Sequence, residues 1–426
     1  ADGRASPSAR IPLASASDLD LILRAYDTWG EACAEHLLGD FAFAIWDAPA
    51  RRLFCARDQM GVKPFFYAHA GRAFVFSNTL DAVRRHPAVS ARLDELAIAD
   101  FLLFDVNTDA GSSMFADIRR LAPGHTAVCS ADGVRVRRYW TLPIDEPLEY
   151  RRQQDYVERF NELLHAAVSD RIRQRRVALF MSGGLDSPTP AVAATDVLAE
   201  RHRQPEVLAF TEVYDTLIPD DERHYAGLVA RALGLVHDVR ARDDEAFEHS
   251  WVHLPEPTSR PFGVRAAREQ HGRVAAHVRT VLYGEGPDNA LKNDWRPYVR
   301  GLVQRGRWGT LARTMWDHVM THSRLPLPRF AAGMPHAHQG LPAWIQPGFA
   351  ARLNLEARWR AFGPALPEPG ACRPAAHASF DPRMWQSAFE GLDPAWTGAP
   401  VEFRHPFVDL RLLRFLLAVP PGPLCR

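Results

Sequence analysis

The sequence has few lysines and cysteines, no net charge and no long apolar run, and each shortage excludes a class of protein. Only Lys63 and Lys292 are lysines, so arginine carries nearly all of the positive charge. The five cysteines are widely spaced and form no C-x-x-C pair, which argues against a disulfide framework and a structural zinc site. Because Lys plus Arg and Asp plus Glu both number 51, no net field favours nucleic acid or an anionic membrane.

The length and the apolar content indicate a globular protein. No apolar run reaches about 18 residues and no signal peptide is found, so we expect no membrane span and a cytoplasmic location. The composition is 46% hydrophobic and 24% charged, and 426 residues are enough for two domains with their own cores.

The first part of the chain has the pattern of an antiparallel sheet. Between Phe41 and Ser77, short apolar segments alternate with turns. A further hairpin is predicted around Asp132 and Gly133, and a proline-bearing linker follows near residues 143 to 148. We therefore expect one domain over residues 1–142 and a second over 143–426.

The second part has the pattern of a parallel sheet covered on both faces. An amphipathic helix is predicted from Tyr156 to Ile172, and a second helix follows from Pro188 to Glu200. Strand-like runs alternate with helix-like runs. These strand-like runs are Val177–Met181, Val207–Val213, Val236–Val239 and Thr280–Tyr283. Ligands of such sheets collect at the carboxyl ends of the strands. Residues 295–365 read as helical, and the sequence assigns them no role.

The stretch VALFMSGGLDSPTP, residues 177–190, predicts a strand, a glycine loop and the start of a helix. Such a loop directs backbone N–H groups and a helix dipole at one point, and Gly183 and Gly184 let an anion approach the main chain closely. The spacing and the lysine of the common nucleoside triphosphate loop are absent. The sequence therefore predicts a phosphate site of a different class.

A second polar cluster, YGEGPDNA at residues 283–290, follows another apolar strand. Glu285 and Asp288 would lie near the phosphate loop, because both segments follow strands of one parallel sheet. Mg²⁺ takes one or two carboxylates together with phosphate oxygens, so Asp186 and Asp288 are the expected metal ligands. Glu285 is then available for proton transfer. In a third cluster, Asp409 is predicted to cap the helix Leu410–Ala418.

The strings SGGLDS, GEGPDNA and FRHPFVDLRLL, preceded by GDFAFAIWDAPARRLFCARDQMGVKPFFY, resemble the glutamine-dependent asparagine synthetase family. The resemblance implies an N-terminal-nucleophile (Ntn) amidotransferase domain of α+β type, followed by a Rossmann-like α/β ATP pyrophosphatase (PP-loop) domain with a helical C-terminal part. It implies that Asp186 and Asp288 bind Mg²⁺, that Asp186 and Glu285 are catalytic, and that Asp18 binds glutamine. The ATP-binding residues that it implies are Leu179, Ser182, Gly183, Gly184, Asp186, Ser187, Thr211, Glu212, Gly284, Glu285 and Gly286.

The sequence departs from the family pattern at both ends. The family's glutaminase needs a cysteine as its first residue, whereas this chain begins with Ala1, so we expect a truncated first domain without glutaminase activity. The lysine that the family carries beyond its PFLD-type motif is not matched, so we expect the second domain to be incomplete as well. Pro287 and Asn289 flank Asp288 in place of the commoner GEGADE pattern.

The resemblance implies an ATP-dependent ligase that adenylates a carboxylate, releases pyrophosphate and forms an amide. Aspartate is the default acid, and ammonia or glutamine supplies the nitrogen. Two alternatives stay open: an enzyme that closes an amide ring in a peptide or a β-lactam, and a nucleotide-binding protein without turnover. Glu285 disfavours the β-lactam branch, which has tyrosine there. No nucleic acid or membrane partner is expected, and a homodimer stays open.

Overall fold

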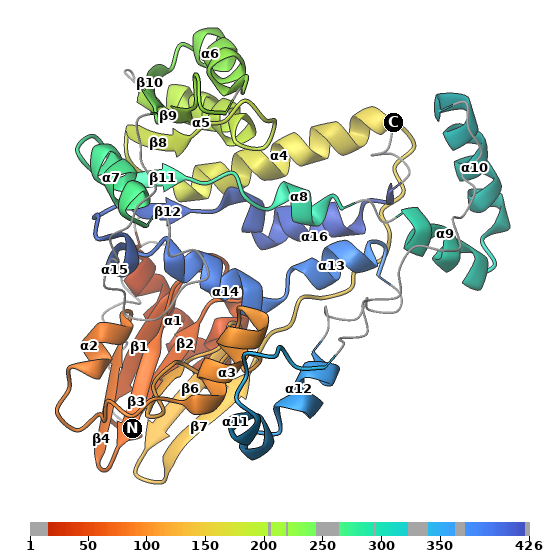
Figure 1. Ribbon diagram of the computed structural model, residues 1–426. Helices are drawn as coiled ribbons and strands as arrows, with labels where there is room; N and C mark the ends of the chain where they lie inside the picture. The colour runs from red at the N-terminus through yellow and green to blue at the C-terminus, as the bar shows by residue number, and fades with distance from the viewer. Residues whose placement is uncertain are drawn as a thin grey trace. The chain divides into compact units, whose positions relative to one another are not determined.

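A computed structural model describes residues 16–202, 206–218, 220–243, 264–292, 295–322, 340–362 and 371–421 (Figure 1). The chain forms two compact units. The first contains residues 1–142 together with 382–391, and the second contains residues 143–381 and 392–426. No helix that the structure describes is long and apolar enough to cross a membrane.

The first unit contains two antiparallel sheets, with strand orders β1-β2-β6-β7 and β4-β3-β5. The strands are β1 (Ala42–Asp47), β2 (Arg52–Arg57), β3 (Phe66–Ala70), β4 (Ala73–Ser77), β5 (Ile118–Arg120), β6 (His125–Ser130) and β7 (Gly133–Arg138). The helical segments are α1 (Asp18–Trp29), η3 (Gly30–His36), α2 (Leu80–Arg84), α3 (Glu95–Phe104) and α14 (Pro382–Gly391). The run of antiparallel strands and the hairpin at Asp132 and Gly133 are confirmed.

Alternate residues of each central strand face different layers, because side chains of a strand point to opposite faces in turn. On β2, Phe54 and Ala56 pack with α1 and η3, whereas Cys55 packs with Tyr67 of β3. On β3, the other face carries Phe66 and Ala68, which pack with residues of α2 and α3. The first unit is therefore a four-layer sandwich of helix, sheet, sheet and helix.

Helix α14 contributes a buried ion cluster to this unit, although it lies about 240 residues beyond the last strand of the unit. Glu390 accepts from Arg120, with 2.9 Å between Oε2 and Nη2, and lies 3.7 Å from Nη2 of Arg57. Gln386 accepts from Nη1 of Arg57 at 2.8 Å. All four side chains are buried. The boundary predicted at residues 142 and 143 leaves α14 in the second part, whereas its contacts group it with the first unit.

The second unit contains a five-stranded parallel sheet in the order β10-β9-β8-β11-β12. Its strands are β8 (Arg176–Phe180), β9 (Glu206–Val213), β10 (Val236–Ala241), β11 (Thr280–Leu282) and β12 (Glu402–Arg404). The four predicted strands are confirmed. Strand β12 was not predicted, because three residues are too short to show a periodic pattern.

The second unit also contains helices, which are labelled in Figure 1. They are α4 (Gln153–Arg171), α5 (Pro188–Arg201), α6 (Glu222–Leu233), α7 (Val264–Ala275), α8 (Pro287–Ala290), α9 (Trp295–Gln304), α10 (Trp308–His322), α11 (Pro347–Arg352), α12 (Leu355–Ala361), α13 (Pro374–Ser379), α15 (Pro394–Thr397), η4 (Pro406–Val408) and α16 (Leu410–Ala418). Because crossovers between parallel strands are right-handed, α5 and α6 cover one face and α7 the other. Asp409 caps α16 as predicted, accepting from the Arg411 N–H.

Removing the charge of Glu390 should destabilise the chain strongly. The substitution Glu390→Gln removes the carboxylate that pairs with the buried guanidinium groups of Arg57 and Arg120, which costs about 3–5 kcal/mol. Urea unfolding followed by circular dichroism measures the loss. The control is Arg92→Gln, which removes the exposed pair with Asp117 and should cost less than about 1 kcal/mol. Equal losses for the two variants would contradict a special role for the buried cluster.

Candidate active site

The sheet reverses its strand order between β8 and β11, and the two predicted polar segments follow these two strands. β8 and β11 are hydrogen-bonded neighbours, with Leu179 opposite Leu282. The crossovers leave this pair in opposite directions, which is where ligands bind in open α/β sheets. Residues 182–187 and 283–290 therefore meet at one edge of the sheet.

The two segments pack closely enough that a side chain would not fit between them. A Cβ atom added to Gly284 would lie 2.8 Å from Cα of Ser187 and 3.0 Å from the carbonyl oxygen of Asp186. Both of these are backbone atoms, so no side-chain rotation could relieve the contact. Gly284 is therefore required by the close approach of the turn to the loop.

Some backbone N–H groups of the loop donate hydrogen bonds to other loop residues, and others have no acceptor in the described part of the chain. The Ser182 N–H donates to Oγ of Ser187 at 2.8 Å, and the Gly184 N–H donates to Oγ of Ser182 at 3.3 Å. The N–H groups of Leu185, Asp186 and Ser187 have no hydrogen-bond acceptor within the described part of the chain. Three consecutive N–H groups at the start of a helix can bind an anion.

Prolines limit the contribution of the helix itself to this anion site. Helix α5 begins with Pro188, and Pro190 lies in the same turn. Proline has no N–H group, and the Thr189 N–H donates to the carbonyl of Leu185. The donors that this segment can offer an anion therefore come from the loop before the helix.

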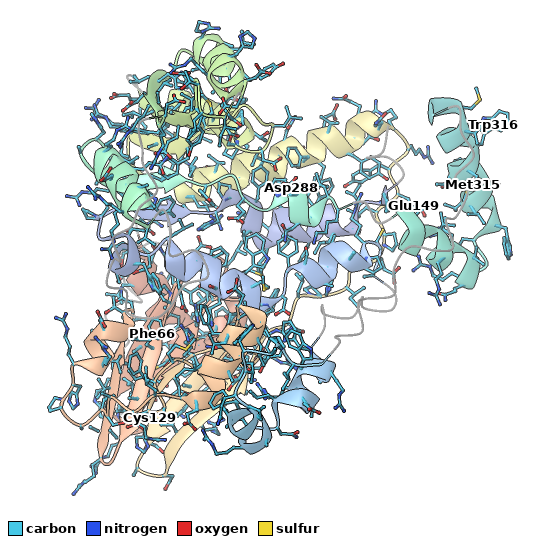
Figure 2. The ribbon with its side chains drawn as sticks, viewed as in Figure 1. Phe66, Cys129, Glu149, Asp288, Met315 and Trp316 are labelled. Atoms are coloured by element: carbon cyan, nitrogen blue, oxygen red, sulfur yellow. The ribbon has the colours of Figure 1, made fainter. Side chains whose placement is uncertain are left out.

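Asp186 and Asp288 face each other without a balancing charge. Burial raises the pKa of Asp186, and the negative charge of Asp288 raises it further. Within the described residues, neither carboxylate has a hydrogen-bond donor or a cationic side chain as partner. Figure 2 marks Asp288 on the short helix α8. Two carboxylates so placed are suited to hold a divalent cation.

The turn that carries Asp288 is anchored by its neighbours. Gly286 has a φ of 134°, and a Cβ there would lie 3.0 Å from Cβ of Phe407. Asn289 donates through Nδ2 to the carbonyl of Ser379 at 3.3 Å. Glu285, between the two glycines, is exposed. The turn is thus held from behind while its acidic side chains, Glu285 and Asp288, remain accessible.

Three of the predicted ATP-binding residues lie on strands rather than in the loop or the turn. Leu179 is fully buried in β8. Thr211 is buried in β9, where its hydroxyl donates to the carbonyl of Met181 at 2.8 Å. Glu212 forms an ion pair with the buried Arg242, with 2.6 Å between the charged atoms. A contact of these three residues with ATP stays a prediction.

Asp18, a predicted residue, lies in the first unit, and Glu222, which was not predicted, bonds to the phosphate loop. Asp18 lies exposed in the first turn of α1, in the first unit, and its binding of glutamine stays a prediction. Glu222 was not predicted, but its carboxylate accepts a hydrogen bond from the Gly183 N–H in the phosphate loop. The two residues are 39 positions apart, so no local pattern could have joined them.

Comparison with known proteins finds two families that match parts of this chain. The glutamine amidotransferase domain family matches residues 7–140, and the asparagine synthase family matches residues 159–423. The chain belongs to the asparagine synthase family. The resemblance predicted from SGGLDS and GEGPDNA is confirmed, as is the mixed fold of antiparallel sheets followed by a parallel sheet.

Individual relatives are about a third or less identical to this chain over the residues that align. Glutamine-hydrolysing asparagine synthetase 3 of Bacillus subtilis is 32% identical over 210 residues, which cover 49% of this chain and 33% of the relative. A Mycobacterium bovis protein provisionally named a glutamine-hydrolysing asparagine synthetase is 31% identical over 91% of this chain and 56% of its own length. The amidase chyE of Penicillium rubens is 26% identical over 64% of this chain and 42% of its own length. The chain thus spans between a third and just over half of these relatives.

Removing the charge of Asp288 should lower the pKa of Asp186. Because burial is the larger cause and remains, the pKa of Asp186 in the Asp288→Asn variant should stay above its ordinary value. A carboxyl whose pKa is raised by folding makes the folded state less stable as the pH rises from the ordinary pKa through the raised one. That decrease should be smaller in Asp288→Asn. Carboxyl ¹³C titration by NMR measures the pKa, and Asp196→Asn, an exposed change on α5, should leave it unaltered.

Adding a methyl group at Gly284 should displace the loop. We expect Gly284→Ala to cost about 1–3 kcal/mol in unfolding free energy, because the new atom meets backbone on the loop side. Gly272→Ala on α7 is the matched control, since a Cβ there meets nothing within 4 Å. That control should gain about 0.5–1 kcal/mol, as alanine does in a helix. A Gly284→Ala chain as stable as the wild type would show that the contact is relieved at little cost.

Proposed function

We propose that this chain is the ATP-dependent, amide-forming part of a ligase of the asparagine synthetase type. In this proposal residues 143–426 adenylate a carboxylate and release pyrophosphate, and an amine then displaces AMP to give the amide. Residues 1–142 correspond to the amidotransferase domain, which supplies ammonia from glutamine in this family. Aspartate is the default acid.

The observation that carries the proposal is the pair Asp186 and Asp288 beside a loop in which three consecutive N–H groups have no acceptor among the described residues. The residues fit a magnesium ion that is shared with a phosphate. Among the described residues no three His, Cys, Asp or Glu side chains gather into a complete metal site. Mg²⁺ commonly takes only one or two carboxylates and completes its shell with phosphate oxygens and water.

In this proposal the loop N–H groups bind phosphate and the two aspartates bind the metal ion. The N–H groups of Leu185, Asp186 and Ser187 would bind phosphate oxygens, which places the α-phosphorus for in-line attack by the acid. Asp186 and Asp288 would hold Mg²⁺, which supplies charge neutralisation for the departing pyrophosphate.

Glu285 would act in the second half of the reaction. As the amine attacks the acyl carbonyl, the new C–N bond forms, the bond to AMP breaks, and the exposed Glu285 carboxylate accepts the proton that the nitrogen loses. The acid and the amine thereby meet at one edge of the sheet, which removes much of the entropic cost of bringing them together.

The test of this function is pyrophosphate release by the purified chain. Release from Mg·ATP that requires aspartate, and that continues over many turnovers only when ammonium is also present, supports the proposal. Release that requires instead a peptide with an acidic side chain would assign the chain to ring-closing amide formation. Binding of ATP without pyrophosphate release, with any acid tried, would assign it to nucleotide binding without turnover.

Loss of either metal carboxylate should abolish this activity. We expect Asp186→Asn and Asp288→Asn each to lower kcat/KM for pyrophosphate release by at least about 100-fold, the loss typical of removing a group that stabilises transition-state charge. Asp196→Asn should retain activity within about twofold, because this carboxylate is exposed on α5 and has no partner among the described residues. Substantial activity in both loop and turn variants would remove the basis of the proposal.

A further inference from the structure

The residue before the phosphate loop is held on both of its backbone groups by β9. The Met181 N–H donates to the carbonyl of Phe210 at 2.9 Å, one step beyond the last paired residues of β8 and β9. The Met181 carbonyl accepts from the hydroxyl of Thr211 at 2.8 Å. A side chain therefore continues the attachment at the position where the strand pairing ends and Ser182 begins the loop.

A histidine on the next strand bonds to the same hydroxyl. Nε2 of His237, in β10, lies 2.9 Å from Oγ1 of Thr211. A threonine hydroxyl has one hydrogen, and a carbonyl can only accept, so that hydrogen is used by Met181. Nε2 of His237 must then be the donor. The neutral ring consequently carries its proton on Nε2, and the bonds run in one direction from His237 through Thr211 to Met181.

The hydroxyl at the centre of these bonds is buried, and the ring of His237 is half-buried. Thr211 is only 3% exposed, and burial also lowers the pKa of His237, which favours the neutral ring. Hydrogen bonds in such an environment are strong when made, and the donor or acceptor left behind is costly when one is lost. The position of Met181 is therefore sensitive to both side chains.

We propose that Thr211 and His237 are positioning residues that set where the phosphate loop begins, and that Thr211 does so without touching the nucleotide. This inference rests on the proposed function only in naming Mg·ATP as the ligand that the loop binds. It assigns Thr211 a different role from the direct ATP contact predicted from the sequence. The hydroxyl acts on ATP through Met181, because both of its bonding partners belong to the protein.

The first test is spectroscopic and needs no ligand. In the chain without nucleotide, ¹⁵N-histidine NMR should show His237 as the Nε2–H tautomer, with the signal assigned by its absence from His237→Gln. A neutral ring protonated on Nδ1 would overturn the proposed direction of the bonds, whatever the chain binds.

The second test measures Mg·ATP affinity by calorimetry in a series of variants. Thr211→Val should raise Kd by about tenfold, the ratio that corresponds to one lost hydrogen bond. Thr211→Ser, which keeps the hydroxyl, should stay within about twofold of the wild type. His237→Leu should resemble Thr211→Val, and His237→Gln, whose amide can donate from a position near Nε2, should recover part of the loss.

Thr195→Val is the matched control, because the Thr195 hydroxyl also donates to a backbone carbonyl, that of Ala191, but within α5. It should leave Kd within about twofold. Unfolding midpoints of all variants show that each is folded at the temperature of the titration. Wild-type affinity in a folded Thr211→Val chain would overturn the positioning role and leave the proposed function intact. Absence of Mg·ATP binding by the wild type would instead overturn the proposed function.

Discussion

Two carboxylates held close together, with no cationic side chain beside them in the described part of the chain, are the constraint on which the site depends. Asp186 and Asp288 come from segments that follow adjacent parallel strands, so the sheet itself sets their approach. In the protein alone this arrangement is unfavourable, because burial and the charge of Asp288 both raise the pKa of Asp186. Such an arrangement persists only where the surrounding packing holds it. Here Gly284 packs against the loop backbone, and Asn289 is tied to Ser379.

The phosphate loop shows the same division between support and function. Ser182, Gly183 and Gly184 use their N–H groups to bond to Ser187, Glu222 and Ser182, and these bonds shape the loop. The next three N–H groups have no acceptor among the described residues. Support also comes from outside, through Thr211 at the residue before the loop and Glu222 within it. The loop is thereby shaped by the protein itself, which would limit the ordering cost of binding the anion proposed for it.

The first unit contains two buried arginines whose carboxylate partner lies far away in the sequence. Arg57 and Arg120 are buried, and the carboxylate between them comes from α14, in the stretch matched by the asparagine synthase family. Buried arginines need a partner, since an unpaired buried charge costs several kcal/mol. The core of the first unit is therefore completed by residues that the sequence separates from it by the whole of the parallel sheet except β12.

Local patterns were sufficient for much of this molecule. Alternating apolar residues predicted the antiparallel strands, and four apolar runs predicted β8, β9, β10 and β11, because these signals depend on neighbours within a few residues. The strand, glycine loop and helix at residues 177–190 and the cap at Asp409 were predicted for the same reason. The pairing of SGGLDS with GEGPDNA also followed, since both segments come after strands of one parallel sheet.

Only the tertiary structure decided which distant groups meet. The three-residue strand β12, the place of α14 in the first unit, the bond from Gly183 to Glu222 and the bonding of Thr211 to Met181 and His237 all join residues far apart in sequence. A residue type shows that a side chain can donate or accept, but not which partner it will reach. That choice depends on how the strands are ordered and which helices cover them. The sequence therefore determined the elements and the chemistry that they carry, and the packing of those elements decided the partner of each group.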